Sequence, residues 1–263
     1  MVSMPIISTA GLARTFTTKA GSVEAVRGID LTVSAGEILG FLGPNGAGKT
    51  TTLRMLTTLL APTGGAATVA GFDLRKDPAA VRRKIGYVAQ SGGVDPQETL
   101  RDELVLQGRL HGRSRADAES RTAELAAELG LTELLDRRTA ALSGGQRRRM
   151  DIALGLIHRP EVLFLDEPTT GLDPGSRADL WRLVRALRDT YGTTVFLTTH
   201  YLDEADALAD RIVVVDKGVV AADGTPAALK QRYAGSPEAS LQDAFLAITG
   251  RAPAPVDATP VAI

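Results

Sequence analysis

The chain has 263 residues and a mass of 27.7 kDa, which is enough for one large α/β domain or two small ones. Hydrophobic residues make up 44% of it, ample for a core, and a net charge of −1 offers no general attraction for nucleic acid or acidic membranes. The absence of cysteine excludes disulfides and thiolate chemistry. Residues 1–5 lack the features of a signal peptide, and no apolar run approaches the roughly 18 residues of a spanning helix. We therefore expect a soluble chain whose association with a membrane would depend on a partner.

The first elements of the chain are predicted to be strands. Residues 6–16 and 23–33 carry apolar residues on either side of a polar, turn-rich stretch. Residues 37–42 form a short apolar run that predicts a third, buried strand. Phe16 could stack on a nucleobase, because a ring face binds a base without a hydrogen-bond code, but burial rates alone favour a core position.

A glycine-rich loop follows the third strand and matches the phosphate-loop pattern G-x-x-x-x-G-K-[ST]. Its residues are Gly43, Pro44, Asn45, Gly46, Ala47, Gly48, Lys49, Thr50 and Thr51. Glycines let backbone N–H groups turn toward phosphate oxygens, Lys49 can reach the β- and γ-phosphates, and Thr50 can ligate Mg²⁺. Because a predicted strand enters the loop and a predicted helix at 51–56 leaves it, nucleoside triphosphate binding is favoured over a simple turn.

The middle of the chain is predicted to change from α/β to purely helical structure. The elements expected first are a turn at 62–65, a strand at 66–71, a helix at 78–84 and a strand at 85–89 that ends at Gln90. Beyond it the apolar residues follow a helical spacing, and strand signals are missing. We therefore predict an α-helical subdomain at about 92–141, inserted into an α/β core.

The pentapeptide Leu142-Ser143-Gly144-Gly145-Gln146 opens a predicted helix that continues to Ile157. Ser143 is a natural N-cap, and the glycines leave backbone N–H groups open beside the positive helix end. An ordinary helix start and an anion-binding site are both compatible with this pattern. The three arginines at 147–149 favour a solvated helix face, with nucleic acid binding as the weaker alternative.

A continuous apolar run at 162–165 predicts a strand buried on both faces, and it ends in Asp166 and Glu167. Adjacent carboxylates at a strand end project to different sides, so they can have different roles. Asp166 suits Mg²⁺ coordination, and Glu167 suits polarising an attacking water. The alternative is an acidic turn before Pro168.

The remainder of the chain continues the α/β pattern. We predict a turn at 171–174, an amphipathic helix around residues 180–187, a strand at 193–198, a hairpin at 211–222, helices at 225–233 and 241–249, and a loose Ala- and Pro-rich tail at 251–263. A lone histidine is usually structural. His200, however, follows a strand end, as Gly43 and Asp166 do, and such ends line the ligand crevice of α/β sheets. This position predicts a contact with the γ-phosphate.

The order of these motifs resembles that of the ATP-binding cassette (ABC) ATPases, and the resemblance covers about residues 12–224. The pentapeptide about twenty residues before the Asp-Glu pair is its most specific sign. The resemblance implies an α/β fold with a P-loop NTPase, RecA-like core, an inserted helical subdomain and an N-terminal antiparallel β region. One ABC ATPase domain would then span residues 1–250.

The resemblance also implies ATP and Mg²⁺ as ligands and gives the matching residues their roles. Phe16 would stack on adenine in place of the tyrosine often found there. Gln90 would touch Mg²⁺ and the attacking water and sense the transporter. Glu167 would be the catalytic base and His200 the γ-phosphate switch. The implied metal ligands are Thr50, Gln90 and Asp166.

A second subunit is implied as well, since cassettes dimerise head to tail with two ATP molecules between them. The residues that would contact the partner's ATP are Ser143, Gly144, Gly145 and Gln146, and Asp173 would lie across the same interface. Residues 170–174 and 224–226 and the short C-terminal extension look most like the daunorubicin-resistance type of drug-efflux ATPase. We therefore expect an ATPase subunit at the cytoplasmic side of the membrane, which powers export of a drug or other hydrophobic compound through separate permease subunits.

Two other classes of function were weighed. Repair ATPases of this family carry a long coiled coil between the phosphate loop and the pentapeptide, and the stretch from Lys49 to Leu142 is too short and lacks sustained heptads. Translation cassettes usually occur in tandem, whereas this chain has one, so we expect no nucleic acid partner. A binding module without catalysis is disfavoured because Glu167 and His200 are both present. A homodimer and a heterodimer, and export and import, are each compatible with the sequence.

Overall fold

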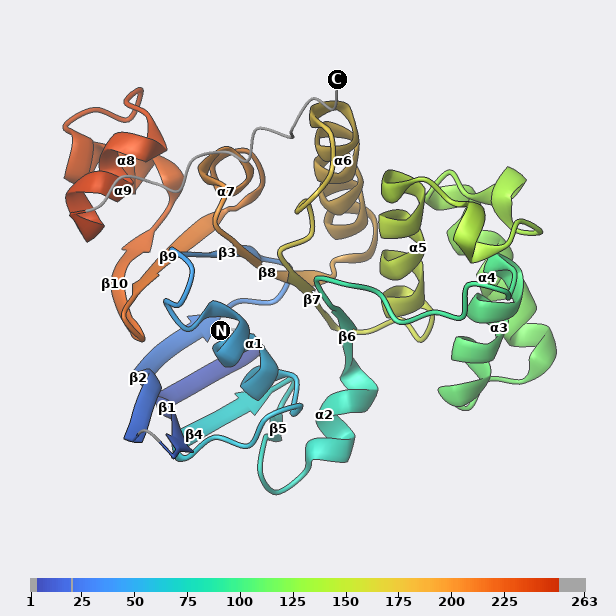
Figure 1. The fold of residues 1–263 in the computed structure, drawn as a ribbon, viewed down its shortest axis with the longest axis horizontal. Helices are drawn as coiled ribbons and strands as arrows, with labels where there is room; N and C mark the ends of the chain where they lie inside the picture. Colours follow the sequence, from blue (N-terminus) through green and yellow to red (C-terminus); the bar gives the residue numbers. More distant parts are fainter. Residues whose placement is uncertain (1–3, 20, 251–263) are drawn as a thin grey trace.

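The computed structural model describes residues 4–19 and 21–250, which form two β-sheets and a set of helices that lie mainly around the second sheet (Figure 1). The tail predicted at 251–263 lies outside these residues. Every helix in the described part of the chain is too short or too polar to cross a lipid bilayer.

The first sheet is antiparallel, as predicted for the N-terminal region. Its strands are β1 (Ile7–Thr18), β2 (Gly21–Val33), β4 (Gly64–Val69) and β5 (Phe72–Asp73), in the order β2-β1-β4-β5. The turn predicted at 62–65 is wrong for its two glycines, because β4 begins at Gly64. A Cβ at Gly65 would lie 2.1 Å from the carbonyl oxygen of Gly11, so the glycine serves a close approach of β1 and β4 rather than a turn.

The second sheet is mostly parallel and lies at the centre of the molecule. Its strands are β3 (Ile38–Leu42), β6 (Ile85–Val88), β7 (Val162–Asp166), β8 (Thr194–Thr199), β9 (Arg211–Asp216) and β10 (Val219–Gly224), in the order β10-β9-β3-β8-β7-β6. Only the β9–β10 pair is antiparallel, which confirms the predicted hairpin. Leu42 pairs with Thr199, and Asp166 pairs with Thr198. The carboxyl ends of β3, β8 and β7 therefore lie side by side.

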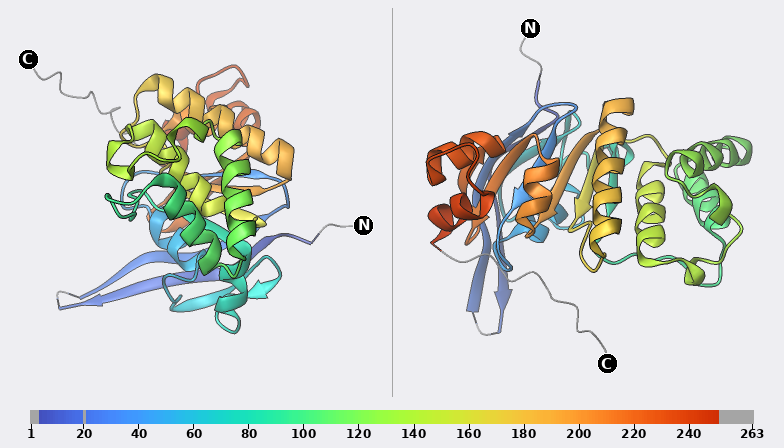
Figure 2. Two further views of the ribbon diagram at one scale, coloured as in Figure 1. Left: turned by 90° about the vertical axis from the view of Figure 1, so that its right-hand side faces the viewer. Right: turned by 90° about the horizontal axis from the view of Figure 1, so that it is seen from above.

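The helices fill both faces of this sheet and both ends of the molecule (Figures 1 and 2). They are α1 (Lys49–Leu56), α2 (Pro78–Lys84), α3 (Leu100–Leu110), α4 (Arg115–Glu128), α5 (Gly144–Leu156), α6 (Pro174–Tyr191), α7 (Leu202–Leu208), α8 (Pro226–Ala234) and α9 (Leu241–Thr249), with short 3₁₀ turns at Thr132–Leu134 and Thr139–Ala141. Helices α3 and α4 lie at one end beside α5, and α8 and α9 lie at the other. The sequence did not predict α7 or β5.

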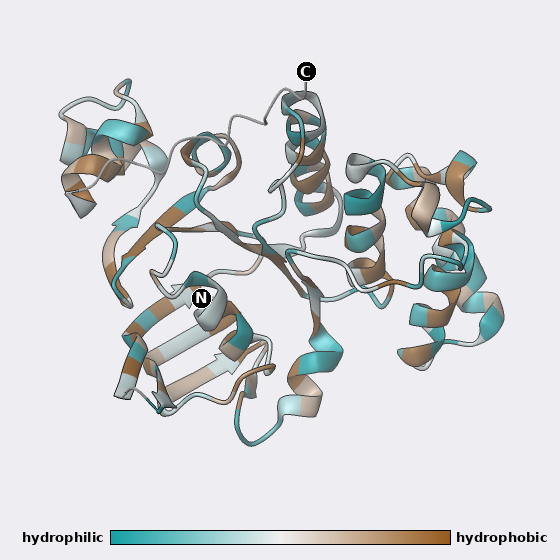
Figure 3. Ribbon diagram, in the orientation of Figure 1, coloured by the Kyte–Doolittle hydropathy of each residue, from teal (hydrophilic) through white to brown (hydrophobic). Residues whose placement is uncertain are grey.

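The core divides along the two faces of the parallel sheet. On β7, Leu163 and Leu165 join the cluster formed with helices α3 to α6, whereas Val162 and Phe164 join the cluster under α1 and the antiparallel sheet. Both faces of this strand are therefore buried, which is why its apolar run is continuous rather than alternating. Figure 3 shows hydrophobic residues along the strands of the central sheet.

Candidate functional site

The phosphate loop joins the end of β3 to the start of α1, and close backbone contacts require glycine at two of its positions. Gly48 has a φ of +100°, and a Cβ there would lie 2.5 Å from the carbonyl oxygen of Ala25. A Cβ at Gly43 would lie 2.3 Å from the carbonyl oxygen of Val215. The first N–H groups of α1 have no partner within the helix, and the helix dipole favours an anion at this end. The start of α1 therefore has the geometry of an anion-binding position, and phosphate binding by the loop stays a prediction.

A polar cavity of about 400 Å³ opens beside this helix start. Its lining residues are Asn45, Gly46, Gly48, Lys49, Thr50, Thr51, Gln90, Glu167, Thr170 and His200. They come from the phosphate loop and α1 and from the segments that follow β6, β7 and β8. The sheet register therefore brings together site residues that lie far apart in the sequence. We call this space the Lys49 cavity.

Lys49 is almost fully buried, with 5% of its surface exposed. Its ammonium group donates hydrogen bonds to the carbonyl oxygens of Gly43 at 2.8 Å and Pro44 at 3.2 Å, and lies 3.4 Å from Oε1 of Glu167. Burial lowers the pKa of Lys49, while Glu167 and Asp166 oppose this effect. A cation with so little water around it interacts strongly with an additional anion such as a phosphate oxygen.

Asp166 and Thr50, two of the three predicted metal ligands, are in direct contact. The Thr50 hydroxyl donates to Oδ1 of Asp166 at 3.1 Å, and the Thr198 hydroxyl donates to the same oxygen at 2.7 Å. Gln90, the third predicted ligand, lines the same cavity. Hydroxyl, carboxylate and amide oxygens are the hard donors that Mg²⁺ prefers, so this donor set fits that ion.

The backbone of Glu167 adopts the left-handed conformation, with a φ of +45°. Its N–H group donates to the Thr198 carbonyl and hydroxyl oxygens, each at 3.1 Å. Left-handed conformations are uncommon for residues other than glycine and are found where surrounding contacts enforce them. The sequence predicted neither this conformation nor the part played by Thr198, although that threonine lies at a strand end two residues before His200.

Several side chains contact the Glu167 carboxylate. Gln90 donates to its Oε2 at 3.2 Å, Thr170 donates to the same oxygen at 3.4 Å, and Nδ1 of His200 lies 3.2 Å from Oε1. Together with Lys49, these groups gather around one nearly buried carboxylate. The contact with His200 is the largest cause that lowers the pKa of Glu167; burial opposes it, and Lys49 adds to the lowering. The structure therefore brings together Glu167, the predicted base, His200, the predicted γ-phosphate switch, and Gln90.

The pentapeptide forms a second group, separate from this cavity. Ser143 caps α5: its hydroxyl accepts from the Gln146 N–H at 3.3 Å, and the Gln146 side chain accepts from the Ser143 N–H at 2.9 Å. A Cβ at Gly145 would lie 3.0 Å from the hydroxyl of Ser176, whose side chain donates to Asp173 at 2.5 Å. Asp173 itself caps α6. The structure thus brings the pentapeptide next to Asp173, and neither lines the Lys49 cavity.

Phe16 lies on β1 opposite Val23 and is partly exposed, so a core position is wrong for it. The guanidinium carbon of Arg14 lies 4.6 Å from the centre of its ring. The ring is not among the residues that line the Lys49 cavity. Its stacking on adenine stays a prediction.

Arg148 was expected to lie on a solvated helix face, but it is buried, with only 6% of its surface exposed. Its guanidinium group binds three backbone carbonyls near the Lys49 cavity. Arg147 is exposed and Arg149 partly so, which means that the solvated-face interpretation is wrong for the middle arginine. The spacing of Arg148, Ile152 and Leu156, each four residues apart, places all three on one helix face and could have revealed the buried position.

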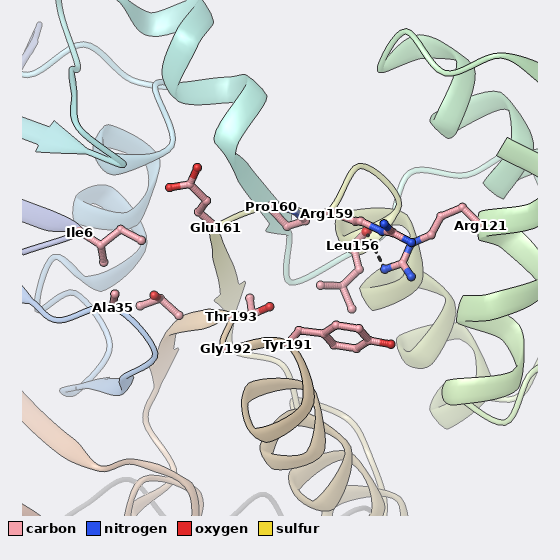
Figure 4. Close-up of a pocket in the computed structure, with 11 residues that line it drawn as sticks. Ile6, Ala35, Arg121, Leu156, Arg159, Pro160, Glu161, Tyr191, Gly192 and Thr193 are labelled. Atoms are coloured by element: carbon pink, nitrogen blue, oxygen red, sulfur yellow. Dashed lines mark hydrogen bonds between the residues drawn. The ribbon is translucent and has the colours of Figure 1, made fainter. Parts of the chain in front are cut away.

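Another cavity, of about 420 Å³, lies at the opposite edge of the parallel sheet, near the start of β8 (Figure 4). Arg121 and Arg159 line it and are both paired with Glu124 at 3.0 Å. Arg121 also donates to the Leu156 carbonyl at 3.4 Å. These two arginines of the second cavity therefore share one acidic partner.

Comparison with known proteins identifies the family of the chain. A family model described as ABC transporter matches residues 26–170, and the chain belongs to this family. It is 53% identical over 224 residues to the daunorubicin/doxorubicin resistance ATP-binding protein DrrA of Streptomyces peucetius, covering 85% of this chain and 66% of that protein. It is 40% identical over 215 residues to the linearmycin resistance ATP-binding protein LnrL of Bacillus subtilis (strain 168), covering 82% of this chain and 69% of that protein. The chain thus spans about two thirds of the length of these relatives.

Solved structures of ABC cassettes confirm the predicted fold class. An ATP-binding subunit of an ABC transporter superposes with a TM-score of 0.80 at 27% identity, covering 93% of this chain and 99% of that one. The cassette MJ0796, in a dimeric post-hydrolysis state bound to ADP and Pi, superposes with a TM-score of 0.76 at 25% identity. That match covers 83% of this chain and 98% of the neighbour.

Proposed function

We propose that the chain binds Mg²⁺-ATP in the Lys49 cavity and hydrolyses it to power a transporter. The observation that carries this proposal is the convergence of Lys49, Thr50, Glu167 and His200 on one cavity at the carboxyl ends of three neighbouring parallel strands. Asp166 lies beside them, because its Oδ1 accepts a hydrogen bond from Thr50. Strand ends of this kind are where α/β sheets bind ligands. The phosphates would lie against the start of α1, within reach of the Lys49 ammonium.

Thr50, Asp166 and Gln90 would hold the metal ion. When bound, Mg²⁺ would neutralise the negative charge that develops on the phosphates during phosphoryl transfer. Asp166 is kept in position by Thr198, whose hydroxyl donates at 2.7 Å to the oxygen that Thr50 also contacts. The two threonines thus fix the orientation of the carboxylate before any ligand arrives.

Glu167 would activate the attacking water. Its depressed pKa keeps it ionised at neutral pH, which allows it to accept a proton or to orient the water. His200 lies against the same carboxylate and would contact the γ-phosphate, so it can relate the position of Glu167 to the state of the nucleotide. Gln90 donates to the other carboxylate oxygen and could do the same for the metal ion.

The complete site would be shared between two chains. Ser143 and its neighbours form a capped helix start that does not line its own chain's Lys49 cavity, and Asp173 lies next to it. A head-to-tail dimer would place this helix start against the ATP of the second chain. The dimeric structure of MJ0796 supports such an arrangement.

The transport partner would be one or more permease subunits in the membrane, with this chain at the cytoplasmic side. Two hollows of about 250 and 210 Å³ share Tyr87, Gln107 and Leu154, and the smaller one is also lined by residues 91–94, directly after Gln90. Large exposed apolar side chains lie at or near these hollows: Leu59, Leu106 and Leu110, at 58, 53 and 73% exposure. Such a surface suits a protein partner. The names of the drug-resistance relatives support export of a drug or other hydrophobic compound.

Phosphate release by the purified chain tests the catalytic proposal. Release should require Mg²⁺, and Glu167→Gln should bind ATP but turn it over on the order of 10²–10⁴ times more slowly, which is the usual cost of losing a general base. Lys49→Ala should weaken ATP binding itself. Glu161→Gln is the matched control, because Glu161 lies near the other end of β7 and pairs with Lys84 at the surface. Full turnover by Glu167→Gln would remove Glu167 from the mechanism.

A further inference from the structure

Arg148 is a buried arginine whose three guanidinium nitrogens each bind a backbone carbonyl. Nε donates to Pro168 at 2.8 Å, Nη1 to Ala89 at 2.6 Å and Nη2 to Asp166 at 3.1 Å. Hydrogen bonds from a charged donor are roughly twice as strong as neutral ones, and the planar fork of arginine fixes their directions. One side chain of α5 therefore holds two separate loop segments in place.

The three carbonyls belong to the segments that carry the predicted chemistry. Asp166 and Pro168 are the residues on either side of Glu167, and Ala89 is the residue before Gln90. Glu167 has a φ of +45°, a strained conformation that persists only where its surroundings enforce it. By binding both flanking residues, Arg148 holds the backbone of Glu167 in its left-handed turn.

A purely structural ion pair is the main alternative explanation for this residue. Asp151 lies on the same helix, and its Oδ2 is 3.7 Å from Nη1 of Arg148. That separation is longer than each of the three carbonyl contacts, which range from 2.6 to 3.1 Å. Asp151 thus compensates part of the buried charge, while the directed hydrogen bonds go to the loops around Glu167 and Gln90.

We propose that Arg148 is a positioning residue for ATP hydrolysis, because it fixes Glu167 and Gln90 relative to helix α5, which Ser143 caps. This inference rests on the proposed function, because it takes Glu167 as the group that activates water. In the shared site, Ser143 would contact the ATP of the second chain. Arg148 lies five residues further along the same helix, so contact at one end of α5 is communicated directly to the backbone of Glu167.

Steady-state kinetics of three variants test this role. Arg148→Met should lower kcat on the order of 10- to 100-fold, since a displacement of about 1 Å at reacting groups can cost 10²-fold. The KM for ATP should change little, because Lys49 and the phosphate loop are untouched. Arg148→Lys keeps the charge but cannot supply the forked donors, so its kcat should fall between those of the wild type and Arg148→Met. Arg147→Met, an equal loss of charge at an exposed neighbour, should leave kcat unchanged.

A double-mutant cycle decides whether Arg148 acts through Glu167. Adding Arg148→Met to Glu167→Gln should cause almost no further loss of turnover, because residues that act as a unit are strongly non-additive. Losses that multiply would show that Arg148 acts independently and would overturn the proposal. If Arg148→Met fails to bind ATP or to unfold cooperatively, Arg148→Lys carries the test, and an unchanged kcat in that variant overturns the proposal.

The outcomes also separate this inference from the function on which it rests. Slow turnover by Glu167→Gln together with normal kcat in Arg148→Met would leave the ATPase proposal intact and overturn the role of Arg148. Full turnover by Glu167→Gln would overturn both, since Arg148 would then have no catalytic group to position.

Discussion

Two helices of this chain begin at a glycine-rich segment, and their surroundings differ. Helix α1 begins at Lys49, beside a cavity where side chains from three strand ends meet. Helix α5 begins at Gly144 and is capped by Ser143, whose capping partner is Gln146 of the same helix; the nearest neighbours of this helix start include Leu172 and Ser176. The first helix start is surrounded by polar side chains of its own chain, whereas the second lies outside its own chain's Lys49 cavity. In the proposed head-to-tail dimer, one chain would therefore carry two unlike halves of a site.

The largest expected effect on this comparison comes from Ser143→Arg. The bulk of arginine and the displaced hydrogen bonds should prevent a second chain from docking, so hydrolysis should fall by about 10²–10³, the cost of losing one donor to a reacting group. ATP binding to the single chain should survive, because the Lys49 cavity is unchanged. Light scattering should give the molar mass of a dimer for Glu167→Gln with ATP. It should give the molar mass of a monomer when Ser143→Arg is added.

Ser114 offers a matched control for this substitution. It caps α4 at another exposed helix start, where its hydroxyl accepts from the Asp117 N–H at 3.1 Å. Ser114→Arg therefore removes a comparable cap and adds the same side chain, and it should leave hydrolysis unchanged. Undiminished turnover by Ser143→Arg, or activity from a proven monomer, would contradict the proposal that the site is shared between two chains.

Two smaller substitutions of Ser143 have an intermediate expected effect and distinguish its capping role from a contact with a second chain. Ser143→Ala should lower the free energy of unfolding by about 1 kcal/mol through loss of the cap, and Ser143→Gly by only a few tenths. Both substitutions remove the hydroxyl, so both should slow hydrolysis if it meets the partner's ATP. Urea denaturation and phosphate release measure the two quantities. Normal turnover in the stable Ser143→Gly protein would reduce Ser143 to a cap.

The smallest expected effect concerns the charge of Glu167. Because the contact with His200 lowers its pKa below the ordinary 4.5, the ionised carboxylate stabilises the fold above about pH 4.5. This contribution is lost as the pH falls through the depressed pKa. The difference in unfolding free energy between wild type and Glu167→Gln should therefore be greatest at neutral pH and disappear in acid.

The Ser143 cap provides the contrast for this titration. Its partners are a hydroxyl, an amide and backbone groups, which do not titrate. The stability difference caused by Ser143→Ala should therefore stay constant over the same pH range in urea denaturation. A Glu167→Gln difference that is equally constant would contradict the assigned pKa direction.

Local patterns in the sequence predicted the parts of the site that are local in the structure. The phosphate loop, the Asp166-Glu167 pair and the capping role of Ser143 each depend on residues within a few positions of one another. The apolar run at 162–165 predicts strand β7, because burial on both faces leaves a continuous apolar run. The physical cause of each of these features therefore lies within one short stretch of the sequence.

The features that the sequence missed depend on long-range neighbours. The glycine at 65 was assigned to a turn, because only the structure shows that the Gly11 carbonyl lies against it. Arg148 looked solvated within a run of charges, since its partners Ala89, Asp166 and Pro168 lie many residues away on other elements. Residue type alone does not reveal which carbonyls a buried guanidinium will meet.

The strand order of the parallel sheet also determines when the protein can first benefit from its ligand. Strand β3, which leads into the phosphate loop, lies between β8 and β9, and Leu42 pairs with Thr199 and Val214. A ribosome-bound chain therefore exposes the phosphate loop long before the neighbours of β3 have been synthesised. Such long-range parallel pairing is slow to form and leaves strand edges open to aggregation. Because ATP would stabilise the folded state, it can begin to stabilise the nascent chain only once β9 has emerged from the ribosome.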